Sequence, residues 1–100
     1  MKELLLFTVA GLFAYDYHKK SPLHRNSLVD KEVQLIPEPT NRYDPFAIEV
    51  KFNNDKLGYV PRTQTSVIHN AIGKNKLGKA VVIFHEPSAI VVKVYDNQED

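Results

Sequence analysis

Apolar residues recur at every second position along much of this chain, which is the spacing of strands with one buried face. The clearest case is Ala47–Phe52, where three apolar side chains alternate with the charged residues Glu49 and Lys51. Asn53-Asn54-Asp55 follows as a turn, and Lys56–Val60 is again rich in apolar residues. The pattern predicts a β-hairpin in which the alternating apolar side chains point inward.

Two further segments are rich in β-branched residues, Ala80–Phe84 and Ile90–Tyr95. The stretch His85–Ser88 between them contains a proline and predicts a second hairpin. A shorter apolar run, Val33–Ile36, ends at Pro37, which cannot donate a hydrogen bond within a sheet. We therefore expect a short strand there.

The N-terminal run Leu4–Phe13 is almost continuously apolar. It is too short to span a membrane, and Glu3 cancels the charge that Lys2 would contribute to a secretory signal. A signal peptide remains an alternative, but a small domain needs these apolar residues for its core. We expect a first strand buried on both faces and no membrane partner.

One segment has helical spacing, Thr63–Ile72, with Thr63 as a candidate cap and Gly73 as its end. The stretch His18–Asn26 contains Ser21-Pro22 and is typical of a loop. Together the elements predict a mainly β fold, a small six-stranded OB-like or SH3-like barrel with one short α-helix. The apolar stripe of that helix is formed by Val67, Ile68, Ala71 and Ile72.

Composition narrows the function. The chain has 100 residues, of which 43% are hydrophobic, so it fits one folded domain. It has no cysteine, which excludes disulfides, thiol nucleophiles and zinc–thiolate sites. Its four histidines lie far apart in sequence, and its four glycines form no phosphate-binding loop. We therefore expect no enzyme, no catalytic residue, no cofactor and no metal, and the composition is compatible with the cytoplasm.

The net charge of +1 is unevenly distributed. Residues 96–100 carry three of the twelve acids and no apolar residue, which predicts one domain over 1–95 followed by an acidic disordered tail. Residues 1–95 then carry thirteen bases and nine acids, a balance of +4. This excludes a highly charged protein that coats nucleic acid but leaves room for a local basic patch.

The segment from Pro37 to Arg62 contains the most informative loop. Asn41-Arg42-Tyr43-Asp44 presents an amide, a guanidinium, a phenol and a carboxylate between two predicted strands, beside three prolines that stiffen the backbone. Such rigid polar loops commonly carry binding sites. In the structural alternative, Asn41 and Asp44 only cap turns, while Tyr43 closes one end of the barrel.

The same segment resembles the HIRAN domain family. That family has a Glu-Pro-x-Asn-x-Tyr-Asp-x-x-Ala-Ile-x-Val pattern, then Gly-Tyr-(Val/Ile)-Pro-Arg and a short helix, after a first strand containing a valine and a glycine. The resemblance covers about residues 7–95 and favours the strand over the signal peptide at the N-terminus. The matching positions here are Val9, Gly11, Glu38-Pro39, Asn41, Tyr43-Asp44, Ala47-Ile48, Val50 and Gly58-Tyr59-Val60-Pro61-Arg62.

The resemblance implies a non-catalytic module that binds single-stranded DNA and its 3′-hydroxyl end in a groove of the barrel. By position, Asn41 matches an asparagine that hydrogen-bonds the DNA backbone, and Tyr43 matches a tyrosine that packs on the terminal base. Asp44 matches an aspartate that accepts a hydrogen bond from the 3′-hydroxyl, and Arg62 matches a basic residue that contacts phosphate. A separate helicase or nuclease chain in DNA repair is the implied protein partner.

The first strand departs from the DNA-end-binding members. Phe13 stands where they carry an arginine, and Ala14 stands where they carry an aromatic residue. Tyr15 follows at a position that is also aromatic in those members, so it joins the predicted nucleic-acid-binding set. The departures support a second hypothesis, a protein-interaction or structural barrel that serves as an accessory subunit and has lost DNA-end binding.

Overall fold

The computed structural model describes residues 2–11, 28–86 and 88–97, and the structural statements below concern these residues. Outside the described residues lie Phe13, Ala14 and Tyr15, together with the predicted loop His18–Asn26. The strands are β1 (Lys2–Thr8), β2 (Glu32–Pro37), β3 (Ile48–Phe52), β4 (Asp55–Tyr59), β5 (Leu77–Glu86) and β6 (Ala89–Asp96), and a short 3-10 turn η4 (Arg62–Gln64) leads into helix α1 (Thr65–Gly73).

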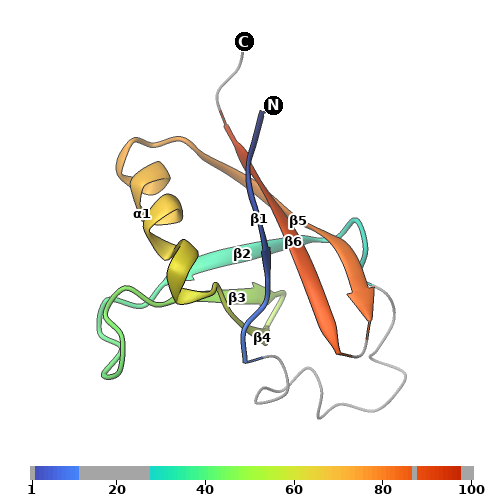
Figure 1. Ribbon diagram of the computed structural model, residues 1–100, viewed down its shortest axis with the longest axis horizontal. Helices are drawn as coiled ribbons and strands as arrows, with labels where there is room; N and C mark the ends of the chain where they lie inside the picture. The colour runs from blue at the N-terminus through green and yellow to red at the C-terminus, as the bar shows by residue number, and fades with distance from the viewer. Residues whose placement is uncertain (1, 12–27, 87, 98–100) are drawn as a thin grey trace.

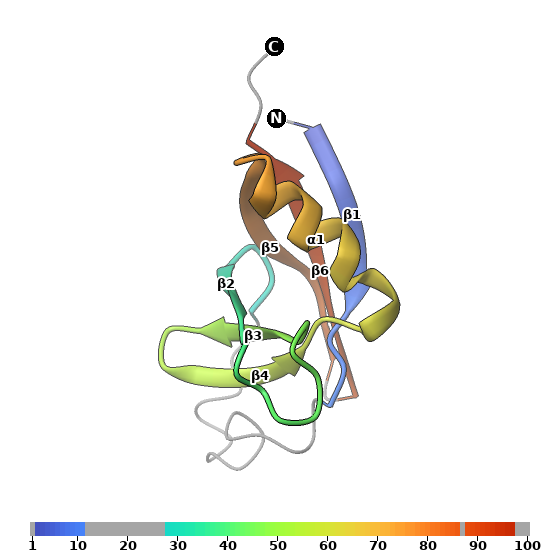
Figure 2. The same cartoon turned by 90° about the vertical axis from the view of Figure 1, so that its left-hand side faces the viewer.

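The six strands form one antiparallel sheet in the order β1-β6-β5-β2-β3-β4. β2, β3 and β4 run across the direction of β1, β5 and β6, so the sheet is strongly bent (Figures 1 and 2). The segment that follows β1 approaches the other edge strand, β4, where Ala10 and Tyr59 form an isolated antiparallel bridge. The mainly β fold with one short helix is confirmed, but the sheet is not closed, so the barrel stays a prediction.

Both predicted hairpins are present, as β3–β4 and β5–β6. In β3 the side chains of Ile48 and Val50 are fully buried, as the alternation predicts. Asn53 occupies the turn with a φ of 53°, a left-handed conformation that asparagine tolerates. The second hairpin has a tighter connection than expected, because β5 continues through Glu86 and β6 begins at Ala89.

The expectation that the first strand is buried on both faces is wrong. Among the described residues β1 is an edge strand that pairs with β6 alone, and within it only Phe7 is buried. Leu6 is 42% exposed, although the carbonyl of Leu6 accepts a hydrogen bond from Gln64 Nε2 at 2.7 Å. Leu4 and Leu5 are partly buried against the core beside Phe7, so the strand packs on the core without being covered on both faces.

The helix begins later than the sequence suggests. Thr63 lies in η4 rather than at the cap, and Gln64 occupies the N-cap position without a side-chain hydrogen bond. Val67 and Ile72 were expected on the buried stripe but are 41% and 38% exposed. The buried residues of α1 are Thr65, Ile68 and Ala71.

The C-terminal strand extends past the expected domain boundary at residue 95. Asp96 pairs with both Lys2 and Leu77, and Asn97 donates its backbone N–H to the carbonyl of Lys76 at 2.8 Å. Residues 98–100 of the expected tail lie outside the described residues. The β-structure therefore includes the first residue of the segment that the charge pattern assigned to the tail.

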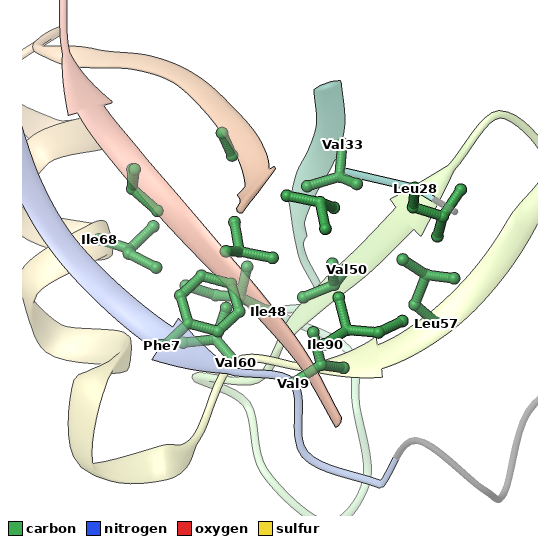
Figure 3. Packing of buried hydrophobic residues seen from close by; sticks show 14 residues of the cluster. Phe7, Val9, Leu28, Val33, Ile48, Val50, Leu57, Val60, Ile68 and Ile90 are labelled. Carbon is green, nitrogen blue, oxygen red and sulfur yellow. The ribbon is translucent and has the colours of Figure 1, made fainter. Parts of the chain in front are cut away.

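The core lies inside the bend of the sheet, and α1 contributes Ile68 to it at one end (Figure 3). Ile68 of α1, Phe7 of β1, Ile48 and Val60 belong to this cluster, as do Leu57 and Val50 on the β3–β4 side. The candidate site described below consists of two segments, the loop that ends at Ile48 and the stretch that contains Val60. Both of these residues belong to the core. The site is thus attached to the most buried part of the molecule.

Candidate functional site

The loop between β2 and β3, residues 38–47, is held in shape by its own polar side chains. Asn41 Oδ1 accepts hydrogen bonds from the backbone N–H groups of Tyr43 at 2.9 Å and of Asp44 at 3.0 Å. Asp44 Oδ1 accepts one from the N–H of Phe46 at 2.9 Å. These are turns in which an Asn or Asp side chain stands in for a backbone carbonyl. The structural interpretation of Asn41 and Asp44 as turn caps is therefore correct, and each retains polar atoms beyond that role.

A hydrogen-bonded cluster under the loop joins it to β4. Glu38 Oε1 accepts hydrogen bonds from Asn41 Nδ2 at 2.9 Å and from the Tyr59 hydroxyl at 2.8 Å. Lys56 Nζ donates to the same hydroxyl at 2.6 Å and lies 4.0 Å from Glu38 Oε2. The cluster fixes the amide of Asn41, so that its oxygen faces the loop backbone.

In this cluster the pKa of Glu38 is lowered and the pKa of Tyr59 is raised. Burial alone would raise the pKa of Glu38, but the hydrogen bonds from Asn41 and Tyr59 and the charge of Lys56 outweigh it and lower the pKa below 4.5. Burial raises the pKa of the Tyr59 phenol above 10.0, opposed by the hydrogen bond from Lys56 and assisted by Glu38. Glu38 is thus an ionised acceptor, and Tyr59 a neutral donor to it, at neutral pH.

A second segment, from Tyr59 to Arg62, leaves β4 and runs beside the loop (Figure 2). The Arg62 carbonyl accepts a hydrogen bond from the buried Thr65 hydroxyl at 3.1 Å, which anchors the backbone of η4. The side chain of Arg62 is 80% exposed, and its Nε lies 3.4 Å from Asp44 Oδ2. Because the guanidinium is exposed to solvent, its ion pair with Asp44 is screened and leaves it accessible to an anion.

The two segments enclose a pocket of about 340 Å³, which we call the end pocket. Tyr43 is 92% exposed, so its ring is available to a ligand, whereas the side chain of Asp44 is only 18% exposed. Four of the five predicted site residues meet here, and the fifth, Tyr15, lies outside the described residues. The pocket is lined by Ala10, Asn41, Tyr43, Asp44, Ala47, Tyr59, Val60 and Arg62.

Comparison with known proteins identifies the family. The HIRAN domain model matches residues 5–99, nearly the whole chain. The chain belongs to the HIRAN family. HIRAN is a family known for DNA binding and a binding domain that is not catalytic by itself.

Two crystal structures share the HIRAN fold with this chain. A protein from Lactobacillus plantarum is 22% identical with a TM-score of 0.74, and the match covers 95% of this chain and 93% of that one. The HIRAN domain of human HLTF is 19% identical with a TM-score of 0.67, covering 94% of this chain and 76% of that one. No curated protein sequence matches the chain significantly.

Sequence reasoning missed three polar residues of this HIRAN domain that support the end pocket. Glu38 and Tyr59 lie in the two motifs that match the HIRAN family, and this position was the sign in the sequence that they belong to the site. Lys56 lies in neither motif, so nothing in the sequence indicated it. Within the described ranges, no group of three residues that could hold a metal ion occurs. In the same ranges, no helix is long and apolar enough to cross a membrane.

Replacing Glu38 tests whether the cluster stabilises the loop. We expect Glu38→Gln to lower the free energy of unfolding at pH 7 by about 1 kcal/mol, because hydrogen bonds to a charged acceptor are stronger than those to a neutral one. Since folding lowers the pKa of Glu38, its contribution is present above the unfolded value of 4.5 and is lost as the pH falls through the folded value.

Urea denaturation of the wild type and of Glu38→Gln at neutral and acidic pH measures the difference between their free energies of unfolding. The exposed Glu32→Gln at the other end of β2 is the matched control and should have little effect at either pH. A deficit in Glu38→Gln that persists unchanged in acid would show that the charge of Glu38 does not stabilise the fold.

Proposed function

We propose that this HIRAN domain binds single-stranded DNA and holds a free 3′-hydroxyl end in the end pocket. The observation that carries the proposal is the convergence of Asn41, Tyr43, Asp44 and Arg62 on one pocket from two separate segments. The family's DNA binding supports a nucleic-acid ligand. The chemistry of the four side chains supports an end of a strand as the part that is bound.

Tyr43 and Arg62 supply contacts that do not depend on base sequence. The exposed ring of Tyr43 offers a face for the terminal base, and such stacking contributes about 1–3 kcal/mol per base. The exposed guanidinium of Arg62 offers charge-assisted hydrogen bonds to a phosphate. In this arrangement the phosphate on the 5′ side of the terminal nucleotide pairs with Arg62 in place of Asp44.

Asp44 supplies the selection for a hydroxyl. Its Oδ1 is held by the N–H of Phe46, and its Oδ2 faces Arg62 at 3.4 Å. Once Arg62 turns to a phosphate, Oδ2 accepts a hydrogen bond from the 3′-hydroxyl, whereas a terminal phosphate would be repelled by the carboxylate. Asn41 contributes the second hydrogen of Nδ2, because its oxygen already serves the loop.

A domain that holds a DNA end is useful beside a second protein that acts on it. We therefore propose a separate helicase or nuclease chain as partner, in DNA repair in the cytoplasm. The support is the DNA binding of the family together with a site that holds a strand end without consuming it.

Fluorescence anisotropy tests the function directly. We expect a short single-stranded DNA with a 3′-hydroxyl to bind at least about tenfold more tightly than the same strand with a 3′-phosphate, from one charge-assisted hydrogen bond and the repulsion together. Affinity should fall about 3- to 7-fold between about 50 and 200 mM salt, because one or two phosphates are neutralised.

A matched RNA strand in the same assay distinguishes DNA from RNA. If no strand binds more tightly than about 100 μM at low salt, weaker than the usual non-specific binding of DNA-binding proteins, the DNA-end proposal fails and the protein-interaction module is favoured. Equal binding of the hydroxyl and phosphate strands would contradict the role given to Asp44.

A further inference from the structure

A second pocket, of about 500 Å³, adjoins the end pocket. We call it the Phe46 pocket. It shares the residues Asp44 and Arg62 with the end pocket, so the Asp44–Arg62 ion pair forms the boundary between the two. Its lining consists of Asp44, Phe46, Arg62, Thr65, Ser66 and His69.

Phe46 is a large apolar side chain that remains 65% exposed. Its backbone is held at both ends, because its N–H donates to Asp44 Oδ1 at 2.9 Å and its carbonyl lies 2.8 Å from His69 Nε2. The rings of Phe46 and His69 meet edge to face, with centroids 6.1 Å apart and planes 79° apart. The result is an ordered aromatic surface that the core does not cover.

His69 presents a defined polar atom beside this surface. A carbonyl oxygen accepts hydrogen bonds only, so Nε2 of His69 carries the hydrogen in its contact with Phe46. In the neutral ring Nδ1 is then an acceptor. Apolar ring faces with a few polar atoms at the rim suit a flat heteroaromatic ligand such as a nucleobase.

The position of Arg62 connects the two pockets along a nucleotide chain. We propose that the Phe46 pocket binds the base of the second nucleotide from the 3′ end, with the phosphate between the last two nucleotides on Arg62. This inference rests on the proposed function, because it places the next nucleotide of the strand whose end Asp44 holds. The shared boundary and the exposed cation are what favour the same DNA strand over another occupant.

An abasic residue within the strand tests the placement. We expect an abasic second nucleotide to weaken binding to the wild type about five- to a hundredfold, the range of one base–aromatic stack, and an abasic fourth nucleotide to have little effect. Phe46→Ala should weaken binding of the intact strand by a similar factor. The abasic second nucleotide should then cost little more, because the two changes remove the same contact.

Two further variants keep the test interpretable. Phe84→Ala removes a phenylalanine that is 43% exposed on β5 and lines neither pocket, so it should bind both strands as the wild type does. Phe46→Leu retains apolar bulk without the aromatic face and should resemble Phe46→Ala in binding. Thermal melting of all variants establishes that each remains folded.

The outcomes separate this inference from the function on which it rests. If the wild type prefers a 3′-hydroxyl but tolerates the abasic second nucleotide, the end pocket stands and the Phe46 pocket is not a base site. An equal abasic penalty in the wild type and Phe46→Ala would place the second base elsewhere. A wild type that binds no strand overturns both proposals.

Discussion

Asp44→Asn is expected to abolish the preference for a 3′-hydroxyl over a 3′-phosphate. The substitution keeps an oxygen that can accept the hydrogen bond from the N–H of Phe46, so the loop should retain its shape. It removes the negative charge that strengthens the bond to the hydroxyl and repels a phosphate. Affinity for the hydroxyl strand should fall about 5- to 30-fold, as a charged acceptor becomes a neutral one.

The ion pair with Arg62 adds a second effect in the opposite direction. Without the carboxylate 3.4 Å away, the guanidinium is available to a terminal phosphate, so the phosphate strand should bind more tightly to Asp44→Asn than to the wild type. Arg62→Ala should weaken both strands together. The division of roles is thus a loss of selectivity for one variant and a loss of affinity for the other.

Anisotropy with both strands measures the two effects at once. Glu32→Gln, which makes the same charge change at an exposed position far along β2, should behave as the wild type. If Asp44→Asn and Arg62→Ala each lowered the affinity for both strands by the same factor, the assignment of Asp44 as the hydroxyl acceptor would be contradicted.

The loop of the site was predictable because its determinants are local. Asn41 and Asp44 bond to backbone groups within three residues of themselves, so sequence spacing alone indicates the turns. The meeting of Arg62 with this loop depends on the pairing of β3 with β4. That pairing follows from the alternating pattern and the turn at Asn53, whereas the grouping of Arg62 with the loop residues follows only from the HIRAN resemblance.

The supporting contacts could not be read from spacing. Glu38 and Tyr59 lie 21 residues apart, and their hydrogen bond requires the register of three strands and the path of the loop. Phe46 lies two residues before β3, in phase with the buried Ile48 and Val50, so the alternation wrongly indicates that its ring points inward. The contact between Phe46 and His69 joins the β2–β3 loop to α1 across 23 residues of sequence, so spacing along the chain does not indicate it.

The burial of the first strand also required the tertiary structure. A run of apolar residues is compatible with one covered face or with two, because hydrophobicity does not determine which elements pack above and below a strand. The partner of β1 is the last strand of the chain, and its other side is an edge. The predicted start of the helix was wrong for a related reason. The hydroxyl of Thr65, and not that of Thr63, points inward and donates to the Arg62 carbonyl.

Gly58→Ala is expected to destabilise the fold by about 2–3 kcal/mol, the cost of forcing extra atoms into a packed site. A methyl group at Gly58 would overlap the carbonyl oxygen of Ala10 and lie 2.7 Å from Val9 Cγ1, closer than real side chains approach. The φ of +156° at this position is also rarely adopted by other residues. A loss of this size should lower the melting temperature by about 10–20 °C for a domain of this length.

Gly73→Ala is the matched control. It lies at the end of α1 with nothing within 4 Å of the added methyl group, so it should be neutral or stabilising by up to about 1 kcal/mol. Equal melting temperatures for both variants and the wild type would show that the segment after β1 does not close onto β4 as described.

Gly58→Ala should also affect the site, because the added methyl group would push apart the two segments that form the Ala10–Tyr59 bridge. Ala10 and Tyr59 exchange two backbone hydrogen bonds of 2.8 Å there, and both residues line the end pocket. Pushing Ala10 outward removes one wall of the pocket and shifts the phenol that holds Glu38. Below its melting temperature, folded Gly58→Ala should therefore bind the 3′-hydroxyl strand more weakly than folded Gly73→Ala. Equal affinities would mean that the edge-to-edge bridge stabilises the fold without shaping the site.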